Sequence, residues 1–178
     1  QQAIAAQQSV AAIKQQMRQD QRAWLKMSAG ISAYAEGKPF VVPMTIVNTG
    51  KTDAKDIKIE VICKKLKTGE SPTFKYDSRF VSARTGVLFP NDPFSFNASV
   101  LVENSPGGTM IAEPLTGNDF KEFLAGNMTV VTYARVTYSD IFGIRHWMRF
   151  CVVNTKPTAD ARSSTDAKCP EYNNEDNN

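Results

Sequence analysis

Residues 39–63 read PFVVPMTIVNTGKTDAKDIKIEVIC, two stretches of alternating apolar and polar residues joined by a short polar connection. A period of two is typical of strands that bury one face. The connection starts at Asn48 and contains Gly50, both residue types that favour turns. Pro43 lacks an amide hydrogen, so we expect its part of the strand to lie at a sheet edge or a bulge. The stretch predicts one corner of an antiparallel β-sandwich, and it offers no group that would carry catalysis.

Alternating patterns elsewhere predict most of the remaining fold. The residues from 67 to 84 read as a long loop or irregular edge, and Thr116 can cap a short helix that runs to Leu124. Strands are expected at residues 24–28, 86–89, 94–102, 128–138 and 144–153. We therefore expect a mainly β fold, an immunoglobulin-like antiparallel β-sandwich with one short inserted helix and an N-terminal helical extension. An up-and-down barrel is the alternative.

The domain organisation expected from these patterns has three parts. Residues 1–20 form a helix or linker, residues 21–155 the sandwich, and residues 156–178 a polar tail. With 42% hydrophobic and 22% charged residues, the chain has an ordinary globular composition. Its net charge of +3 is too small to indicate nucleic-acid binding.

Residues 1–20 are rich in Gln and Ala, and their apolar positions follow a helical spacing of three and four. These positions are Ala3, Ala6, Val10, Ile13 and Met17. An isolated helix of this length is marginal in water. We expect it either to bind a partner through Val10, Ile13 and Met17 or to continue an upstream helix; a frayed polar lead-in is the alternative.

The three cysteines fall into two kinds. Cys63 shares a strand face with apolar residues and is expected to be a buried thiol. A disulfide between Cys151 and Cys169 would tether the polar tail to the sheet and would indicate an oxidising compartment. Two unrelated thiols in a cytosolic protein are the alternative. Beyond Cys169 the chain is acidic and rich in Asn, and we expect disorder there.

Catalytic chemistry finds little support in the sequence. His146 is the single histidine, and the chain has neither an HExxH motif nor a cysteine pair at metal-ligand spacing. No serine lies in a nucleophile elbow. We therefore expect no enzyme activity, no metal and no cofactor.

Several segments together resemble a broad group of uncharacterised bacterial membrane-anchored proteins with a C-terminal immunoglobulin-like, CARDB-like domain. The matching segments are DQRAW at 20–24, the corner at 48–54, the helix at 115–126, YSDIFG at 138–143, and the run from His146 to Cys151 with Cys169 and the acidic end. The resemblance implies a membrane anchor upstream of Gln1 and a position on the periplasmic side of the envelope. It implies no activity and no site residues.

Two functions are expected from these observations. The first is a non-enzymatic interaction or scaffold module of the cell envelope, including service as an accessory subunit of a larger membrane protein complex. Its partners would be other envelope or membrane proteins. The alternative is a module that binds a glycan or small ligand through outward aromatic and basic residues, namely Arg145, His146, Trp147 and Arg149.

Overall fold

The described part of the chain folds into antiparallel β-sheets with two helices. We describe it from a computed structural model, which defines residues 2–76, 82–156 and 165–176. The helices are α1 (Gln2–Asp20) and α2 (Gly117–Ala125). The strands are β1 (Leu25–Ala29), β2 (Val41–Asn48), β3 (Ala54–Lys67), β4 (Ser82–Leu88), β5 (Pro93–Ser99), β6 (Leu101–Glu103), β7 (Met110–Ala112), β8 (Met128–Ser139), β9 (Arg145–Thr155) and β10 (Thr165–Lys168).

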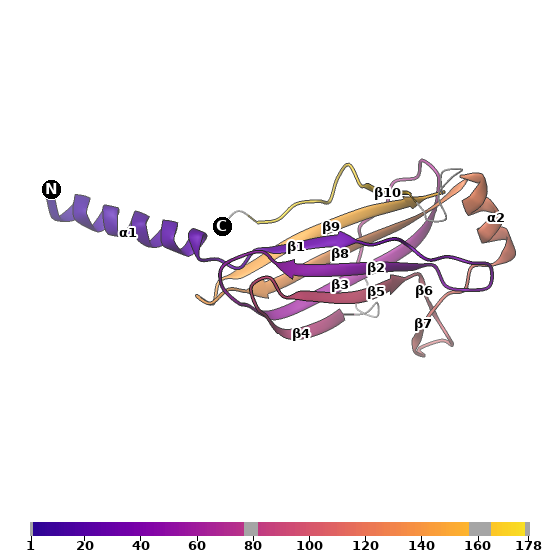
Figure 1. Ribbon diagram of the computed structural model, residues 1–178, viewed down its shortest axis with the longest axis horizontal. Coiled ribbons are helices and arrows are strands. Elements are labelled where there is room, and N and C mark those ends of the chain that lie inside the picture. Colours follow the sequence, from indigo (N-terminus) through magenta and orange to yellow (C-terminus); the bar gives the residue numbers. More distant parts are fainter. Residues whose placement is uncertain (1, 77–81, 157–164, 177–178) are drawn as a thin grey trace.

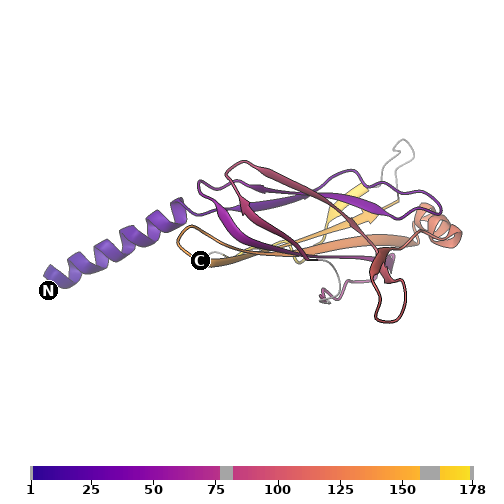
Figure 2. The same ribbon diagram turned by 90° about the horizontal axis from the view of Figure 1, so that it is seen from below.

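The strands form two main sheets, which lie as two layers (Figures 1 and 2). The smaller has the order β1-β2-β5 and the larger the order β10-β9-β8-β3-β4. Strands β6 and β7 form a separate two-stranded ribbon. The described strands thus make separate sheets and not one closed barrel. Helix α1 extends away from one end of the sheets, and α2 lies at the other end (Figure 1).

Alternating side chains from both sheets meet in one hydrophobic core. Val42, Met44 and Ile46 of β2 face inward, as the pattern predicts. Met148 and Phe150 of β9 lie in the same core. Burial of an aliphatic side chain of this size contributes about 1.5–3 kcal/mol relative to exposure. The inner faces therefore hold the two layers together.

The corner after β2 is fixed by one buried side chain. Asn48 donates from Nδ2 to the carbonyl oxygens of Thr52 at 2.7 Å and Leu88 at 3.0 Å. Its Oδ1 accepts from the amides of Trp24 at 3.3 Å and Gly50 at 3.0 Å. A side chain at Gly50 would collide with the backbone of Arg22 and Trp24. The corner consequently holds the segment that joins α1 to β1.

Pro43 does not lie on an edge strand. Strand β2 is the central strand of the smaller sheet, and Pro43 pairs with Asn97 of β5. On the other side the strand pairing of β1 with β2 ends at Ala29, the Gly30 amide donates to the Pro43 carbonyl at 2.7 Å, and a bridge joins Ala33 and Val41. The missing amide hydrogen of Pro43 therefore falls where the regular ladder with β1 ends. The predicted edge position is wrong, and the ladder is irregular instead.

Helix α2 has the caps that its sequence predicts. The Thr116 side chain accepts from the Asp119 amide while the Asp119 carboxylate accepts from the Thr116 amide, which completes a capping box. Gly126 ends the helix with φ 82°, a conformation that favours glycine. Phe123 is buried and packs edge-on against Tyr34 and Phe40. The predicted helix between the late strands is confirmed.

Residues 67–84 are predicted as a long loop or irregular edge, and at their C-terminal end the structure has the beginning of β4 at Ser82, the edge strand of the larger sheet. The backbone of β4 pairs with β3 from Ala54 to Glu60. A sequence such as SARTGVL has little alternation, so only the partner strand defines it as β.

Candidate functional site

The outer face of the larger sheet carries the disulfide. Cys151 and Cys169 are bonded with a Cα–Cα distance of 5.3 Å, as predicted. The bond joins β9 to the end of β10, and the Cys169 amide donates to the Cys151 carbonyl at 3.2 Å. Both sulfurs belong to a second hydrophobic cluster with Ile62, Val131 and Tyr133. The C-terminal segment is therefore covalently attached to this face.

The segment beyond Cys169 is ordered as far as Asp176, so the predicted disorder is wrong. The Arg149 amide donates to the Asn174 carbonyl at 2.7 Å, and the Cys151 amide donates to Asn173 Oδ1 at 3.0 Å. Asp176 is only 6% exposed. These contacts satisfy amides of β9 that would otherwise lack a partner. Composition alone misses this, because the apolar content of the segment is low.

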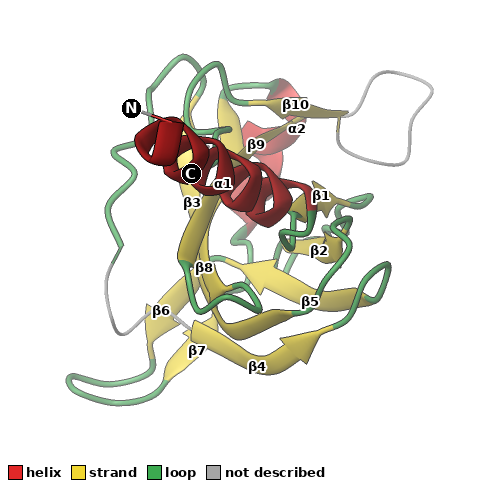
Figure 3. Cartoon of the chain, turned by 90° about the vertical axis from the view of Figure 1, so that its left-hand side faces the viewer, coloured by secondary structure: helices red, strands yellow, loops and turns green. Residues whose placement is uncertain are grey.

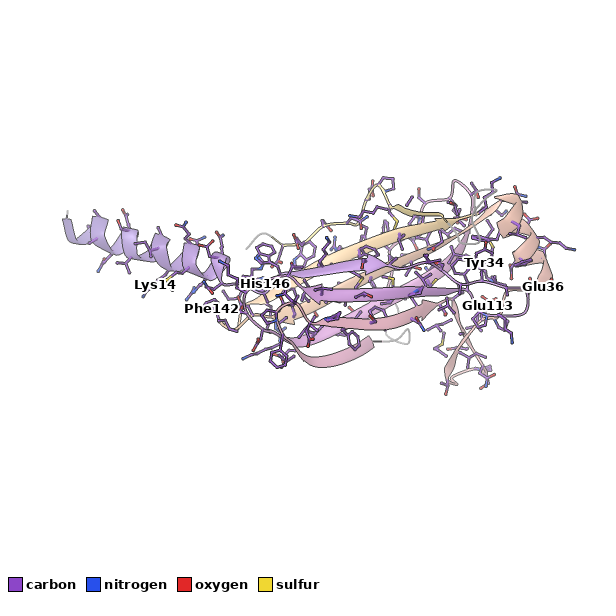
Figure 4. The ribbon with its side chains drawn as sticks, in the orientation of Figure 1. Lys14, Tyr34, Glu36, Glu113, Phe142 and His146 are labelled. Carbon is purple, nitrogen blue, oxygen red and sulfur yellow. A yellow bond between two sulfur atoms is a disulfide. The ribbon has the colours of Figure 1, made fainter. Side chains whose placement is uncertain are left out.

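Asp176 ends the described tail within a buried polar network at the base of α1. Arg22 Nη2 donates to Asp176 Oδ1 at 2.7 Å. His146 Nδ1 lies 2.9 Å from Asp176 Oδ2, and its Nε2 lies 3.1 Å from Asp140 Oδ2. Arg22 also lies 3.9 Å above the Trp24 ring. The network joins the helix junction, the β8–β9 turn and the tail, and Figure 4 shows His146 and Phe142 at this end of the sheets.

The contacts of this buried polar network indicate a structural role. Both ring nitrogens of His146 face carboxylate oxygens, one of Asp176 and one of Asp140, which hold the ring in a fixed orientation. Asp140 Oδ1 additionally accepts from the amides of Phe142 and Ile144, a role typical of aspartate in turns. Burial raises the pKa of Tyr138, while Arg22 acts in the opposite direction. Within the described part of the chain, no group of three or more His, Cys, Asp or Glu residues is placed to hold a metal ion.

The four residues predicted as a ligand surface do not share one face. Trp147 and Arg149 point outward as predicted, and Arg145 is exposed. His146 is only 2% exposed. Its position on β9 alternates with Trp147, so it faces the same side as Met148 and Phe150. The prediction is wrong for His146, which belongs to the buried network.

Arginine and aromatic side chains form a ladder on the outer face. The Arg149 guanidinium lies 4.8 Å from the Trp147 ring and 5.0 Å from the Tyr172 ring. Arg135, directly opposite Arg149 on β8, lies 4.9 Å from the Tyr76 ring. We call Arg135, Arg149, Trp147, Tyr76 and Tyr172 the outer ladder. Tyr76, Arg135 and Tyr172 escape sequence reasoning, because strand register and the path of the tail bring them together.

Glu60 neutralises one of the two arginines. Its Oε2 lies 2.6 Å from Arg135 Nη2, and its Oε1 lies 3.0 Å from Lys58 Nζ. Burial alone would raise the pKa of Glu60, but hydrogen bonds from Lys58 and Arg135 and their charges lower it. Arg149 Nε is buried and has no hydrogen-bond partner among the described residues. The outer face thus retains positive charge.

Helix α1 presents the predicted seam to solvent. Val10 is 51% exposed, Ile13 59% and Met17 57%. Figure 3 looks along the molecule from the α1 end and shows the helix in front of the sheets. Ala11, Lys14 and Arg18 line a hollow between the helix and the β8–β9 turn, so the seam lies on another side of the helix. No helix among the described residues is long and apolar enough to cross a membrane.

Comparison with models of known protein families and with curated proteins finds no match to this chain.

Proposed function

We propose that the chain is a non-enzymatic interaction or scaffold module of the bacterial cell envelope, in which α1 binds a partner through Val10, Ile13 and Met17. The observation that carries this proposal is the exposed apolar seam on a helix that projects from the sheets. Exposed apolar surface of this kind marks interaction sites. In this proposal the two layers form an immunoglobulin-like sandwich that the helix positions.

The junction below α1 supports a defined orientation of the helix. Arg22, two residues after α1, is 2% exposed and paired with Asp176. Gly50 packs against the backbone of Arg22 and Trp24. A fixed direction favours binding of a partner to the seam, because ordering a loose helix on binding costs conformational entropy. In a scaffold role, this junction would hold α1 in one direction relative to the sheets.

The disulfide supports a location in an oxidising space, which for this proposal is the periplasm. Other envelope or membrane proteins are the proposed partners, and the module would serve as an accessory subunit of a larger membrane complex. The upstream anchor implied by the resemblance remains a prediction.

Site-specific photo-crosslinking in living cells tests the seam. A photoreactive residue at position 10, 13 or 17 is expected to give a discrete crosslinked product. Matched positions Gln8 and Ala12, on the other side of α1, serve as controls and are expected to give none. Equal crosslinking from both sides, or none from the seam, would contradict the proposal.

Differential alkylation tests the location. Cys151 and Cys169 are expected to resist alkylation in intact cells until a reductant is added. Recovery of the intact chain in the cytosolic fraction, with both thiols reactive before reduction, would overturn the envelope location.

A further inference from the structure

A hollow of about 680 Å³ crosses the outer face of the larger sheet at the end nearest α1. Trp147 of β9, Thr137 of β8 and Lys58 of β3 line it and are successive cross-strand neighbours. Ser139 and Arg145, paired with each other in the next row, also line it. An indole, two hydroxyl and two basic side chains therefore lie around one depression, which the buried residues Tyr138 and His146 also line.

An irregularity in β3 accompanies this hollow. The register of β3 against β8 shifts between Lys55 and Lys58, and Asp56 there has φ 52°. Asp56 and Ile57 both line the depression. Bulges locally bend a strand and redirect its side chains, and they are frequent next to functional sites. A regular ladder would leave this part of the sheet flatter.

Trp147 is half-buried and lines the hollow, whereas Arg149, which stacks on its ring at 4.8 Å, is not part of the lining. The tail fixes the backbone of Trp147: the Asp176 amide donates to its carbonyl at 3.1 Å, and its own amide donates to Asp176 Oδ1 at 3.4 Å. The strand position that carries the indole is thus held in place before a ligand arrives.

The charge of the site favours an anion. Lys58 and Arg145 line the hollow against the single exposed carboxylate of Asp56. The next outward-facing pair along β8 and β9, Arg135 and Arg149, adds two positive charges. Glu60 contacts both Arg135 and Lys58, so four basic side chains stand against the carboxylates of Asp56 and Glu60. Excess positive charge beside a concave surface attracts anionic ligands.

We propose that this hollow binds an acidic carbohydrate, with a sugar ring against Trp147 and its carboxylate between Lys58 and Arg145. The hydroxyls of Thr137 and Ser139 offer partners for sugar hydroxyls. An extended peptide adds to a sheet at an edge, whereas the backbone groups of β3, β8 and β9 here are paired with one another. This site is independent of the seam on α1 and goes beyond the proposed function.

Calorimetric titration of the full chain with tetragalacturonate tests the site. We expect saturable one-to-one binding, and the methyl ester of the same oligosaccharide, which lacks the negative charges, should bind about tenfold more weakly. Trp147→Ala should weaken binding about fivefold to tenfold and Trp147→Phe less, because stacking persists. Lys58→Gln and Arg145→Gln should each weaken it about threefold and reduce its salt dependence.

The control variant is Lys121→Gln, an exposed lysine on α2 at the far end of the molecule, which should bind like the parent. Circular dichroism of each variant verifies folding, and the glutamine variants test the site even if Trp147→Ala does not fold. Absence of binding at millimolar tetragalacturonate would overturn the proposal. Equal affinity for the methyl ester, or tighter binding of hexaglutamate with no dependence on Trp147, would also overturn it. Loss of the α1 seam by Ile13→Gln should leave tetragalacturonate binding unchanged.

Discussion

The two faces of the larger sheet are buried in different ways. Its inner face, with Val136 and Phe150, packs against the smaller sheet in the main core. Its outer face is covered by the tail around Tyr172 and by the segment around Phe74, which stack at 4.2 Å. The inner face has a second sheet to pack on, whereas the cover of the outer face is held by the disulfide, by hydrogen bonds from the tail to β9, by aromatic stacking and by the buried Asp176 carboxylate. One sheet can thus have an inner face that is buried by a second sheet and an outer face whose burial depends on how the C-terminal tail is attached. We call the cover of the outer face the dependent layer.

This difference matters for function because the dependent layer adjoins the candidate sites. Asp176 holds both the backbone of Trp147 and the side chain of Arg22 at the base of α1. The outer cover therefore influences both the ligand hollow and the direction of the helix, while the inner core serves only to hold the layers together.

Truncation of one aromatic residue on each side tests the comparison most strongly. Phe150→Ala leaves a cavity in the main core and should lower the free energy of unfolding by about 4 kcal/mol. Tyr172→Ala removes a stacked ring from the outer cover and should cost about 1 kcal/mol. Urea unfolding measures both. Equal losses would mean that the two faces are equally important.

Asp176→Ala should have the next largest effect, about 3 kcal/mol, because it leaves Arg22 buried without this carboxylate. Its exposed neighbour Glu175 provides the matched control, and Glu175→Ala should change stability by less than about 0.5 kcal/mol. Hydrogen exchange of the Trp147 and Arg149 amides should rise in the first variant alone. Similar results for both variants would show that the tail is held elsewhere.

Loss of the disulfide should lower the free energy of unfolding slightly less than Asp176→Ala does. The bond closes a separation of 18 residues, so Cys169→Ser should lower the free energy of unfolding by about 2 to 3 kcal/mol. The core should stay folded, and amides of the tail should exchange faster. A reductant should destabilise the parent by a similar amount and leave Cys169→Ser unchanged; an equal response of both proteins would contradict this account.

The smallest effect concerns Cys63 on the inner face. Burial raises the pKa of its thiol from 9.0 to about 12, although a hydrogen bond with Thr132 lowers it. The neutral thiol therefore contributes full stability below pH 9, which is lost as the pH rises towards 12. Between pH 8 and pH 10 the parent should lose about 1 kcal/mol more than Cys63→Ala in urea unfolding. Identical pH profiles would indicate that the thiol is accessible to solvent.

Sequence reasoning predicts much of the fold and only part of the site. The alternation in β2 and β9 identifies their inward residues, and Thr116 and Gly126 mark the ends of α2. The predicted edge position of Pro43 is wrong because it depends on which strands flank β2, and these are distant in sequence. The predicted disorder beyond Cys169 is wrong because the partner of Asp176, Arg22, lies at the other end of the chain. Local patterns carry no information on such distant pairs.

The sequence by itself determined the strands with clear alternation, such as β2 and β9, their apolar faces, and the seam of α1 at Val10, Ile13 and Met17, since each property depends on residues within a few positions of one another. It did not determine β4 or β10, which pairing with a neighbouring strand defines. Tertiary structure alone decided that His146 is buried between two carboxylates, that Asp176 closes on Arg22, and that Trp147 borders a hollow with Lys58. The physical reason is that the register of β3, β8 and β9 and the path of the C-terminal tail bring these groups together. Both follow from packing of the whole chain.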